Sequence, residues 1–136
     1  MEVTNAVRPS PGRALRFFLG RHDGPIVMVN LLKFRPFAKY ADRSDAHITG
    51  REAYLRHGAV ARTLVESVGG HIRYSGDVTG ILLGDVEELW DAVALAEYPS
   101  VRAFRSMALS REMKAIEHHR EAGLLGQLNI RTRPQS

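Results

Sequence analysis

The chain has 136 residues, a formal net charge of +4 and no cysteine. This length fits one domain that can bury a core without disulfides or metal staples. The absence of cysteine excludes a disulfide framework, thiolate metal sites and thiol nucleophiles, and it fits a reducing cytoplasmic location.

Membrane and nucleic-acid partners are not expected. The N-terminal segment, residues 1–11, is polar and lacks the apolar region of a signal peptide. The longest apolar run, 26–32, contains Asn30 and is too short to cross a bilayer. The arginines are spread along the chain, and no platform of stacking aromatics lies between them. We therefore expect a soluble cytoplasmic protein.

The first predicted elements are a short helix and a strand. Ser10 is a good helix N-cap and Pro11 suits the first helical position, so a helix is predicted up to Leu19, where Gly20 ends it. A turn is predicted at residues 23–25 and a strand at residues 26–34. One face of this strand carries Ile26, Met28, Asn30, Leu32 and Phe34, and the other carries Val27, Val29, Leu31 and Lys33. A strand that is apolar on both faces is covered on both.

A polar loop and a long helix follow. Residues 35–49, with Pro36, predict a mobile loop, and residues 50–68 predict a helix that Gly69 and Gly70 end. Its apolar stripe consists of Tyr54, Gly58, Ala61, Val65 and Val68, with His57 and Leu64 beside it. Gly58 in mid-helix costs about 1 kcal/mol relative to Ala. Close approach to the sheet or to a ligand would offset that cost.

The second half of the chain predicts three strands and two helices. Strands are expected at 71–83, with a bulge near Gly76 and Gly80, and at 89–98 after a turn at 84–88. One face of the second of these strands carries Trp90, Ala92, Ala94, Ala96 and Tyr98. Helices are expected from Ser100 to about Leu109 and, after a Ser110 cap, over 111–122. A last strand covers 124–131, and a frayed tail follows.

The element order is βαββαβ after an N-terminal helix. It predicts the α+β class, with an antiparallel sheet in the ferredoxin-like, split-βαβ arrangement. Residues 1–24 form an extension with a short helix, residues 25–132 the domain, and residues 133–136 the tail. Helices cover only one face of such a sheet, so the second apolar face predicts a homodimer formed sheet against sheet.

Polar residues at otherwise apolar positions are the candidate site. Asn30 either donates to a ligand carbonyl or phenolate or ties down a loop. His57 is either a general base or a core histidine. Arg120 either clamps a carboxylate or pairs with an acid such as Glu97. Alternation along the strand leaves open which face Asn30 occupies; in the dimer interface it would be a pairing residue.

Further residues are candidates for binding a substrate. His118 either lines the cleft mouth or lies on a solvated face, and it points about 100° away from His119, which disfavours a shared metal. The aromatic candidates are Tyr54, Trp90 and Tyr98, as walls of a cleft or as plain core. Specific motifs are absent from the sequence, so we predict neither a metal nor a cofactor.

An ordered set of short motifs resembles a known bacterial family. The motifs are Val29-Asn30-Leu31-Leu32-Lys33-Phe34, Gly50-Arg51-Glu52-Ala53-Tyr54, Val68-Gly69-Gly70, Trp90-Asp91, Glu97-Tyr98-Pro99-Ser100 and Arg120-Glu121-Ala122-Gly123-Leu124. Over roughly residues 25–132 the chain is similar to the domain of unknown function 1330 family (DUF1330) of the dimeric α/β-barrel superfamily. The resemblance implies a ferredoxin-like protomer and a barrel made by two sheets in a dimer.

The resemblance does not imply one reaction. The superfamily includes cofactor-free monooxygenases, haem-degrading enzymes, chlorite dismutases, muconolactone isomerases, polyketide cyclases and ligand-sensing domains. Haem-degrading relatives use an Asn on the first strand, a Trp on the third and a His on the second helix. Asn30 and Trp90 match, but residues 101–109 contain no His, which disfavours haem.

We therefore expect a cofactor-independent enzyme that abstracts a proton from a small phenolic or dicarbonyl compound, as a monooxygenase, isomerase or cyclase would. The expected catalytic residues are His57, Asn30 and Arg120, and the expected substrate-binding residues are Tyr54, Trp90, Tyr98 and His118. The alternatives are a non-catalytic module that binds a small acid or aromatic compound, and a purely structural dimer.

Overall fold

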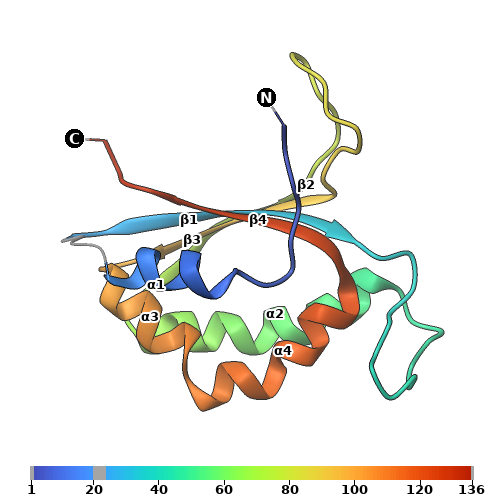
Figure 1. The fold of residues 1–136 in the computed structure, drawn as a ribbon, viewed down its shortest axis with the longest axis horizontal. Coiled ribbons are helices and arrows are strands. Elements are labelled where there is room, and N and C mark those ends of the chain that lie inside the picture. Colours follow the sequence, from blue (N-terminus) through green and yellow to red (C-terminus); the bar gives the residue numbers. More distant parts are fainter. Residues whose placement is uncertain (1, 20–23, 136) are drawn as a thin grey trace.

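The fold has two layers, a four-stranded sheet and a layer of helices on one side of it (Figure 1). The computed structural model describes residues 2–19 and 24–135. The helices are α1 (Pro11–Leu19), α2 (Gly50–Ser67), α3 (Val101–Ala108) and α4 (Arg111–Gly123), and the strands are β1 (Ile26–Phe34), β2 (His71–Asp77), β3 (Ala92–Tyr98) and β4 (Leu124–Thr132). The element order and the α+β class are as predicted.

The sheet has the strand order β2-β3-β1-β4, and all neighbours are antiparallel. β1 is central, with Asn30 opposite Ala94 of β3 and Asn129 of β4. This is the ferredoxin-like arrangement, in which each helical crossover joins two consecutive strands that are not neighbours in the sheet: α2 joins β1 to β2, and α3 and α4 join β3 to β4.

Side-chain caps explain why the helices begin where the sequence predicts. The serine and threonine caps accept hydrogen bonds from backbone N–H groups three residues later: Ser10 from Arg13 at 3.3 Å, Thr49 from Glu52 at 3.0 Å, Ser100 from Ala103 at 3.0 Å and Ser110 from Met113 at 3.1 Å. Residues 20 and 23, which belong to the predicted helix end and turn, lie outside the described residues.

The predicted lengths of β2 and β3 are wrong. β2 ends at Asp77 and β3 begins at Ala92, and residues 78–91, here called the arm, form an irregular segment that projects past the sheet (Figure 1). Gly84, which belongs to the predicted turn at 84–88, has a φ of 88°. The register shift between β2 and β3 lies between Ile72 and Tyr74, upstream of the glycines where a bulge was expected.

Part of the predicted loop at residues 35–49 is packed against the helices, although residues 41–47 are exposed. The Ala38 and Tyr40 side chains are 6% and 8% exposed and form a cluster with Ala53 and Ala122 of the helices. The backbone N–H of Lys39 donates to the Ala122 carbonyl at 2.9 Å. Apolar residues within this polar stretch thus hold it against α2 and α4.

The helices cover the sheet face that contains Asn30, here called the inner face. Ile26 and Met28 of β1 are buried against Val65 of α2 and Ile116 of α4. Because side chains alternate along a strand, Asn30 lies on this same face. It is therefore on the helix-covered side of the sheet and not on the uncovered side.

The opposite face, here called the outer face, is apolar, and no helix of the described residues lies on it (Figure 1). Its apolar side chains, all partly or largely exposed, are Val27, Val29, Leu31, Tyr74, Val93, Leu95, Leu128 and Ile130. Tyr74 is 57% exposed and Ile130 is 45% exposed. An apolar face of this extent marks an interaction surface. None of the helices in the described ranges has the length and apolar composition that a membrane span requires.

Candidate functional site

A chain of hydrogen bonds crosses the inner face from the sheet to α4. The Asn30 Oδ1 atom accepts from Gln127 Nε2 at 2.8 Å, and Gln127 Oε1 accepts from Arg120 Nη1 at 2.8 Å. Arg120 Nη2 donates to Glu117 Oε2 at 2.9 Å. Gln127 can reach Asn30 because it lies opposite Leu32 in the register and so shares the inner face. The guanidinium is therefore held in place from both sides.

The Asn30 side chain forms all of its described hydrogen bonds with residues of the sheet. Its amide nitrogen donates to the carbonyls of Ala94 at 3.3 Å and Met28 at 3.5 Å, while its oxygen receives Gln127. The polar groups that an isolated buried amide would leave without partners are thus satisfied. In this arrangement Asn30 positions Gln127 and, through it, Arg120.

His57 lies in the centre of the helical layer and is 7% exposed. Neither ring nitrogen has a hydrogen-bond partner among the residues that the structure describes. Burial, together with the nearby charges of Arg120 and His119, lowers the pKa of His57 to about 4. The imidazole is consequently neutral at pH 7, with a ring nitrogen free to accept a proton.

One tyrosine borders this histidine. The Tyr54 ring lies 5.6 Å from the His57 ring and 5.6 Å from the Phe34 ring. Burial raises the pKa of Tyr54, although Arg120 opposes that shift. Burial also raises the pKa of Tyr98, and Tyr54 adds to the effect. Both side chains are therefore neutral phenols, and Tyr54 is the one that lies next to His57.

Small residues leave room beside these groups. Ala92, Ala94 and Ala96 line the inner face of β3, and Ala94 is directly opposite Asn30. Gly58 shares the sheet-facing stripe of α2 with Tyr54, and a Cβ built on Gly58 would meet no described atom within 4 Å. Of the two expected explanations for Gly58, close approach to the sheet is therefore excluded, and open space lies beside it. We call Asn30, Tyr54, His57, Arg120 and Gln127 the inner site.

Two predicted substrate-binding residues lie elsewhere. Trp90 precedes β3 and does not share its inner face; its Nε1 donates to Asn5 Oδ1 at 2.8 Å, on the N-terminal segment. His118 is exposed, and its ring lies 3.9 Å from that of His119. The predicted helical angle separates their Cα–Cβ directions, yet the two rings still come together.

The acidic partner of Arg120 differs from the predicted one. Its acid is Glu117, one turn away on α4, and not Glu97. Glu97 lies on the outer face, where its carboxylate accepts from Arg73 Nε at 2.7 Å. Tyr98 is 3% exposed, and its ring lies 4.9 Å from the Phe104 ring, so this residue also belongs to the core.

Sequence reasoning missed Gln127. Its signal is the alternation in β4, where Gln127 and Asn129 interleave with Leu128 and Ile130. That pattern predicts a polar inner-facing edge, but only the register shows that Gln127 meets Asn30. A second cluster was also missed: the Tyr40 hydroxyl lies 2.7 Å from His119 Nδ1 and accepts from Arg56 at 3.2 Å.

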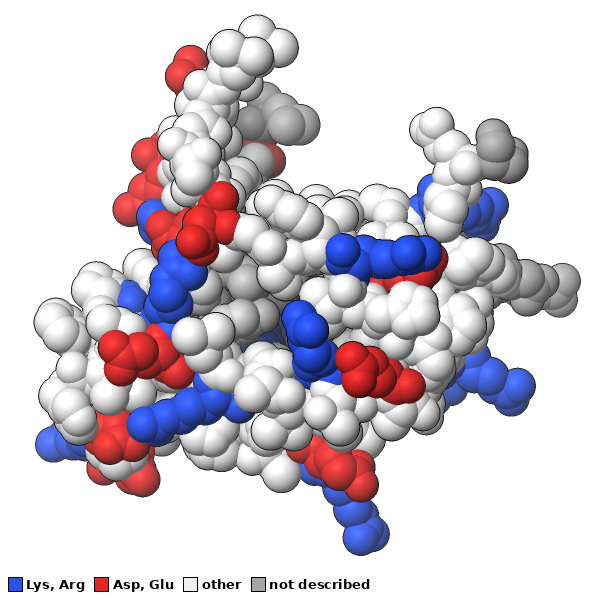
Figure 2. Space-filling model, turned by 180° about the vertical axis from the view of Figure 1, so that it is seen from behind, with Lys and Arg blue, Asp and Glu red and all other residues white. Residues whose placement is uncertain are grey.

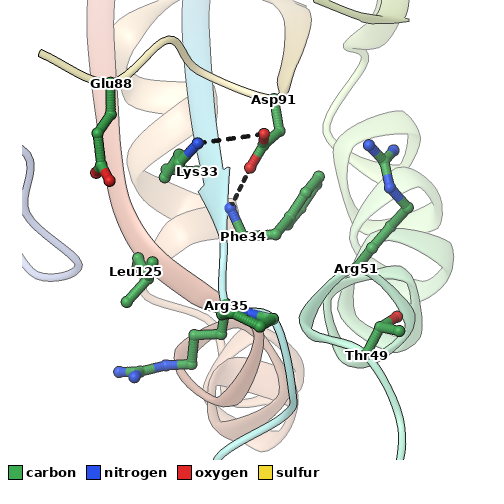
Figure 3. A pocket seen from close by; sticks show the side chains of 9 residues that line it. Lys33, Phe34, Arg35, Thr49, Arg51, Glu88, Asp91 and Leu125 are labelled. Carbon is green, nitrogen blue, oxygen red and sulfur yellow. Dashed lines mark hydrogen bonds and ion pairs between the residues drawn. The ribbon is translucent and has the colours of Figure 1, made fainter.

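An open depression of about 480 Å³ lies at the sheet end where β1 stops, and no predicted site residue lines it (Figure 3). Asp91 fixes its wall by accepting from the Phe34 backbone N–H at 2.8 Å and from Lys33 Nζ at 3.4 Å. The Arg51 guanidinium stacks 4.7 Å from the Phe34 ring centre. Most charges here have partners. Across residues 2–19 and 24–135, no group of His, Asp and Glu is arranged to hold a metal.

Comparisons with known proteins agree with the fold. Neither the protein-family models nor the curated proteins give a match. Two structures of the RPA0582 protein of Rhodopseudomonas palustris, a protein of unknown function, are each 34% identical to this chain and cover 98% of it, with TM-scores of 0.89 and 0.88. This chain covers 98% and 99% of theirs.

More distant structures share the fold alone. A dimeric ferredoxin-like protein of unknown function from Thermobifida fusca is 11% identical, with 84% and 94% of the two chains covered and a TM-score of 0.52. A candidate antibiotic biosynthesis monooxygenase from Caulobacter crescentus is 15% identical, with 84% and 92% covered and a TM-score of 0.52. The ferredoxin-like prediction is confirmed.

Proposed function

We infer that this chain, which belongs to the family of the RPA0582 protein of Rhodopseudomonas palustris, is a homodimeric, cofactor-independent enzyme that abstracts a proton from a small organic acid. The substrate class is a phenolic or β-dicarbonyl compound. The observation that carries the proposal is the neutral, buried imidazole of His57, which has no described hydrogen-bond partner, beside the fixed guanidinium of Arg120.

His57 and Arg120 supply the two groups that such a reaction needs. A ring nitrogen of His57 takes the acidic proton, and the electron pair of the broken C–H or O–H bond passes to the substrate oxygen as an enolate or phenolate. Arg120 stabilises that anion, since two of its five N–H donors suffice to hold it on Gln127 and Glu117. The negative charge next to His57 also raises the proton affinity of the imidazole as the anion forms.

The surroundings favour an aromatic or planar compound. Tyr54 presents its ring to the inner site, and Ala94 and Gly58 leave space beside it. Excluding water from this layer strengthens the attraction between the anion and Arg120. The candidate monooxygenase from Caulobacter crescentus, which has the same fold, lends support to a small-molecule activity of this kind.

The homodimer is proposed through the outer face. Its row of aliphatic side chains is exposed in a single copy, and a second copy packed sheet against sheet would bury it with two-fold symmetry. The fold neighbour from Thermobifida fusca is described as dimeric, which supports this assembly. We propose in addition that the chain is a member of the DUF1330 family and is cytoplasmic, as its lack of cysteine suggests.

The test uses a panel of small β-dicarbonyl and phenolic compounds in D2O. NMR follows the exchange of their hydrogens for solvent deuterium. Wild type should accelerate exchange or turnover of at least one compound, and His57→Gln should lose that acceleration by 100-fold or more. His47→Gln, which changes an exposed histidine of the 35–49 loop, is the matched control and should behave as wild type. Equal rates for His57→Gln and wild type would refute the catalytic role.

The same panel separates the alternatives. Saturable binding with no exchange would identify a non-catalytic binding module, and Arg120→Gln should then weaken the affinity for anionic members. An absence of both binding and exchange would favour a purely structural dimer.

A further inference from the structure

The tip of the arm exposes large apolar side chains that nothing in the described chain covers. Leu82 and Leu83 are 103% and 91% exposed, and Ile81 is 50% exposed. Side chains of this size each gain about 1.5–3 kcal/mol when they are buried. A contiguous trio at the end of a projection therefore marks a contact surface and is not ordinary surface scatter.

The arm projects on the side of the outer face. Figure 1 shows it rising from the sheet away from the helices. It connects Asp77 to Ala92, so about seven residues lead out and about seven return, a reach of up to about 23 Å for extended chain. Packed sheets lie about 10 Å apart. The tip can thus pass the plane of a second sheet packed on the outer face.

For a two-fold axis parallel to the strands, the register identifies the edge of the partner's sheet that the tip would meet. The arm leaves the sheet at the end where β1 stops and β4 begins, since Ala92 pairs with Leu32 and Leu124 pairs with Phe34. β2 and β4 are the two edges of the sheet. A two-fold axis parallel to the strands lays the β2 edge of one copy over the β4 edge of the other, at the same strand end. Leu125, 49% exposed, lies there beside the depression.

Charge complementarity supports the same partner. Asp85, Glu87 and Glu88 follow the apolar tip, and Figure 2 shows acidic side chains gathered along the projecting segment below its uncharged end. None of the three forms an ion pair within residues 2–19 and 24–135. The charged residues that line the depression at the receiving edge are Lys33, Arg35, Arg51, Glu88 and Asp91. Lys33 pairs with Asp91 and Arg51 with Asp77, so Arg35 is the lining cation that has no ion pair among the described residues.

We propose that the arm of one copy clasps a second copy of this chain, with Leu82 and Leu83 seated beside Leu125 of the partner subunit. The inference rests on the proposed homodimer and adds to it a contact that the sheet faces alone do not make. The arm then closes the end of the sheet sandwich, and its acidic residues face Arg35 of the partner subunit.

The absence of native cysteine makes a direct test possible. The double variant Leu82→Cys/Leu125→Cys should form a disulfide-linked dimer under mild oxidation, seen on a non-reducing gel. The matched control, Leu82→Cys/Leu109→Cys, places the second thiol at an exposed position on the helical side and should stay monomeric on the gel. Equal cross-linking in both variants would overturn the placement of the tip.

Sedimentation equilibrium separates this inference from the proposed dimer. Wild type should be dimeric, and Leu82→Asp/Leu83→Asp should raise the dimer dissociation constant at least 10-fold, while Leu55→Asp/Leu109→Asp should not. A dimeric wild type with an unchanged constant in the Leu82→Asp/Leu83→Asp variant refutes the clasp alone. A monomeric wild type refutes the dimer and the clasp together.

Discussion

His57 couples the stability of the fold to pH. Its pKa is about 4 in the folded protein and about 6.5 in an unfolded chain, so the unfolded state binds the proton more readily. The stability that this lowered pKa provides is complete above pH 6.5 and is lost as the pH falls toward 4. Between pH 7 and pH 5 the loss in unfolding free energy should be about 2 kcal/mol.

Urea denaturation at the two pH values measures this effect. His57→Gln should remove that part of the pH dependence, because no titrating group then remains at the position. His47→Gln, which changes an exposed ring, should keep it. If His57→Gln shows the wild-type pH dependence, the histidine is not buried in the neutral form in solution.

Gln127 should matter for stability as well as for placing Arg120. Gln127→Ala leaves the Asn30 Oδ1 atom and an Arg120 N–H without their partners. The free energy of unfolding, measured by chemical denaturation, should fall by about 1–3 kcal/mol. Asn129→Ala changes an exposed amide on the same strand and should cost less than about 0.5 kcal/mol. Similar losses in the two variants would mean that the hydrogen-bonded chain does not hold the site.

The site was predictable where one residue breaks a local pattern. Asn30, His57 and Arg120 each stand out as polar groups on an apolar face, and the structure brings all three to the inner layer. Gln127 did not stand out, because its role in the site depends on which residue of β1 it faces. Trp90 was misplaced because strand alternation was extended past the true start of β3.

At the scale of elements, two glycines set how closely α2 and α4 approach. A Cβ on Gly50 would collide with the Arg35 carbonyl and come within 2.6 Å of the Gly123 carbonyl, and a Cβ on Gly123 would lie 2.8 Å from the Tyr54 nitrogen. Gly50→Ala or Gly123→Ala should therefore force the helices apart and destabilise the protein by about 1–3 kcal/mol.

Gly58→Ala is the matched control on the same helix. Its Cβ would enter open space, so it should raise the unfolding free energy by about 1 kcal/mol, as Ala does in a helix interior. Thermal denaturation of the three variants checks the opposite signs. A stabilised Gly50→Ala or Gly123→Ala would show that the helices do not pack this closely.

Element boundaries were predictable where the signals are local. The serine and threonine caps fixed the helix starts, and the apolar run of β1 matched the observed strand in full. The arm was not predictable, because Ile81, Leu82 and Leu83 continue an apolar pattern that reads as strand. The packing of residues 35–49 depends on Tyr40 reaching α2 and α4, a contact distant in sequence.

For the whole molecule, the division of the sheet into two apolar faces organises the proposals. Between the inner face and the helices lie His57, Arg120 and the row of hydrogen bonds to Asn30, while no described helix covers the outer face. Aliphatic burial on the outer face should drive association, and a charge introduced at its centre should oppose it. Val29, opposite Leu95 and Ile130, lies at that centre.

The molar mass in solution, measured by sedimentation equilibrium for wild type, Val29→Asp and the helix-side control Leu55→Asp, tests the closure of the outer face most directly. Wild type and Leu55→Asp should have twice the mass of the 15.2 kDa chain, and Val29→Asp should be folded, by circular dichroism, and close to 15.2 kDa. A 15.2 kDa wild type, or a Val29→Asp variant that dimerises as tightly as wild type, would contradict the proposal that a second copy covers this face.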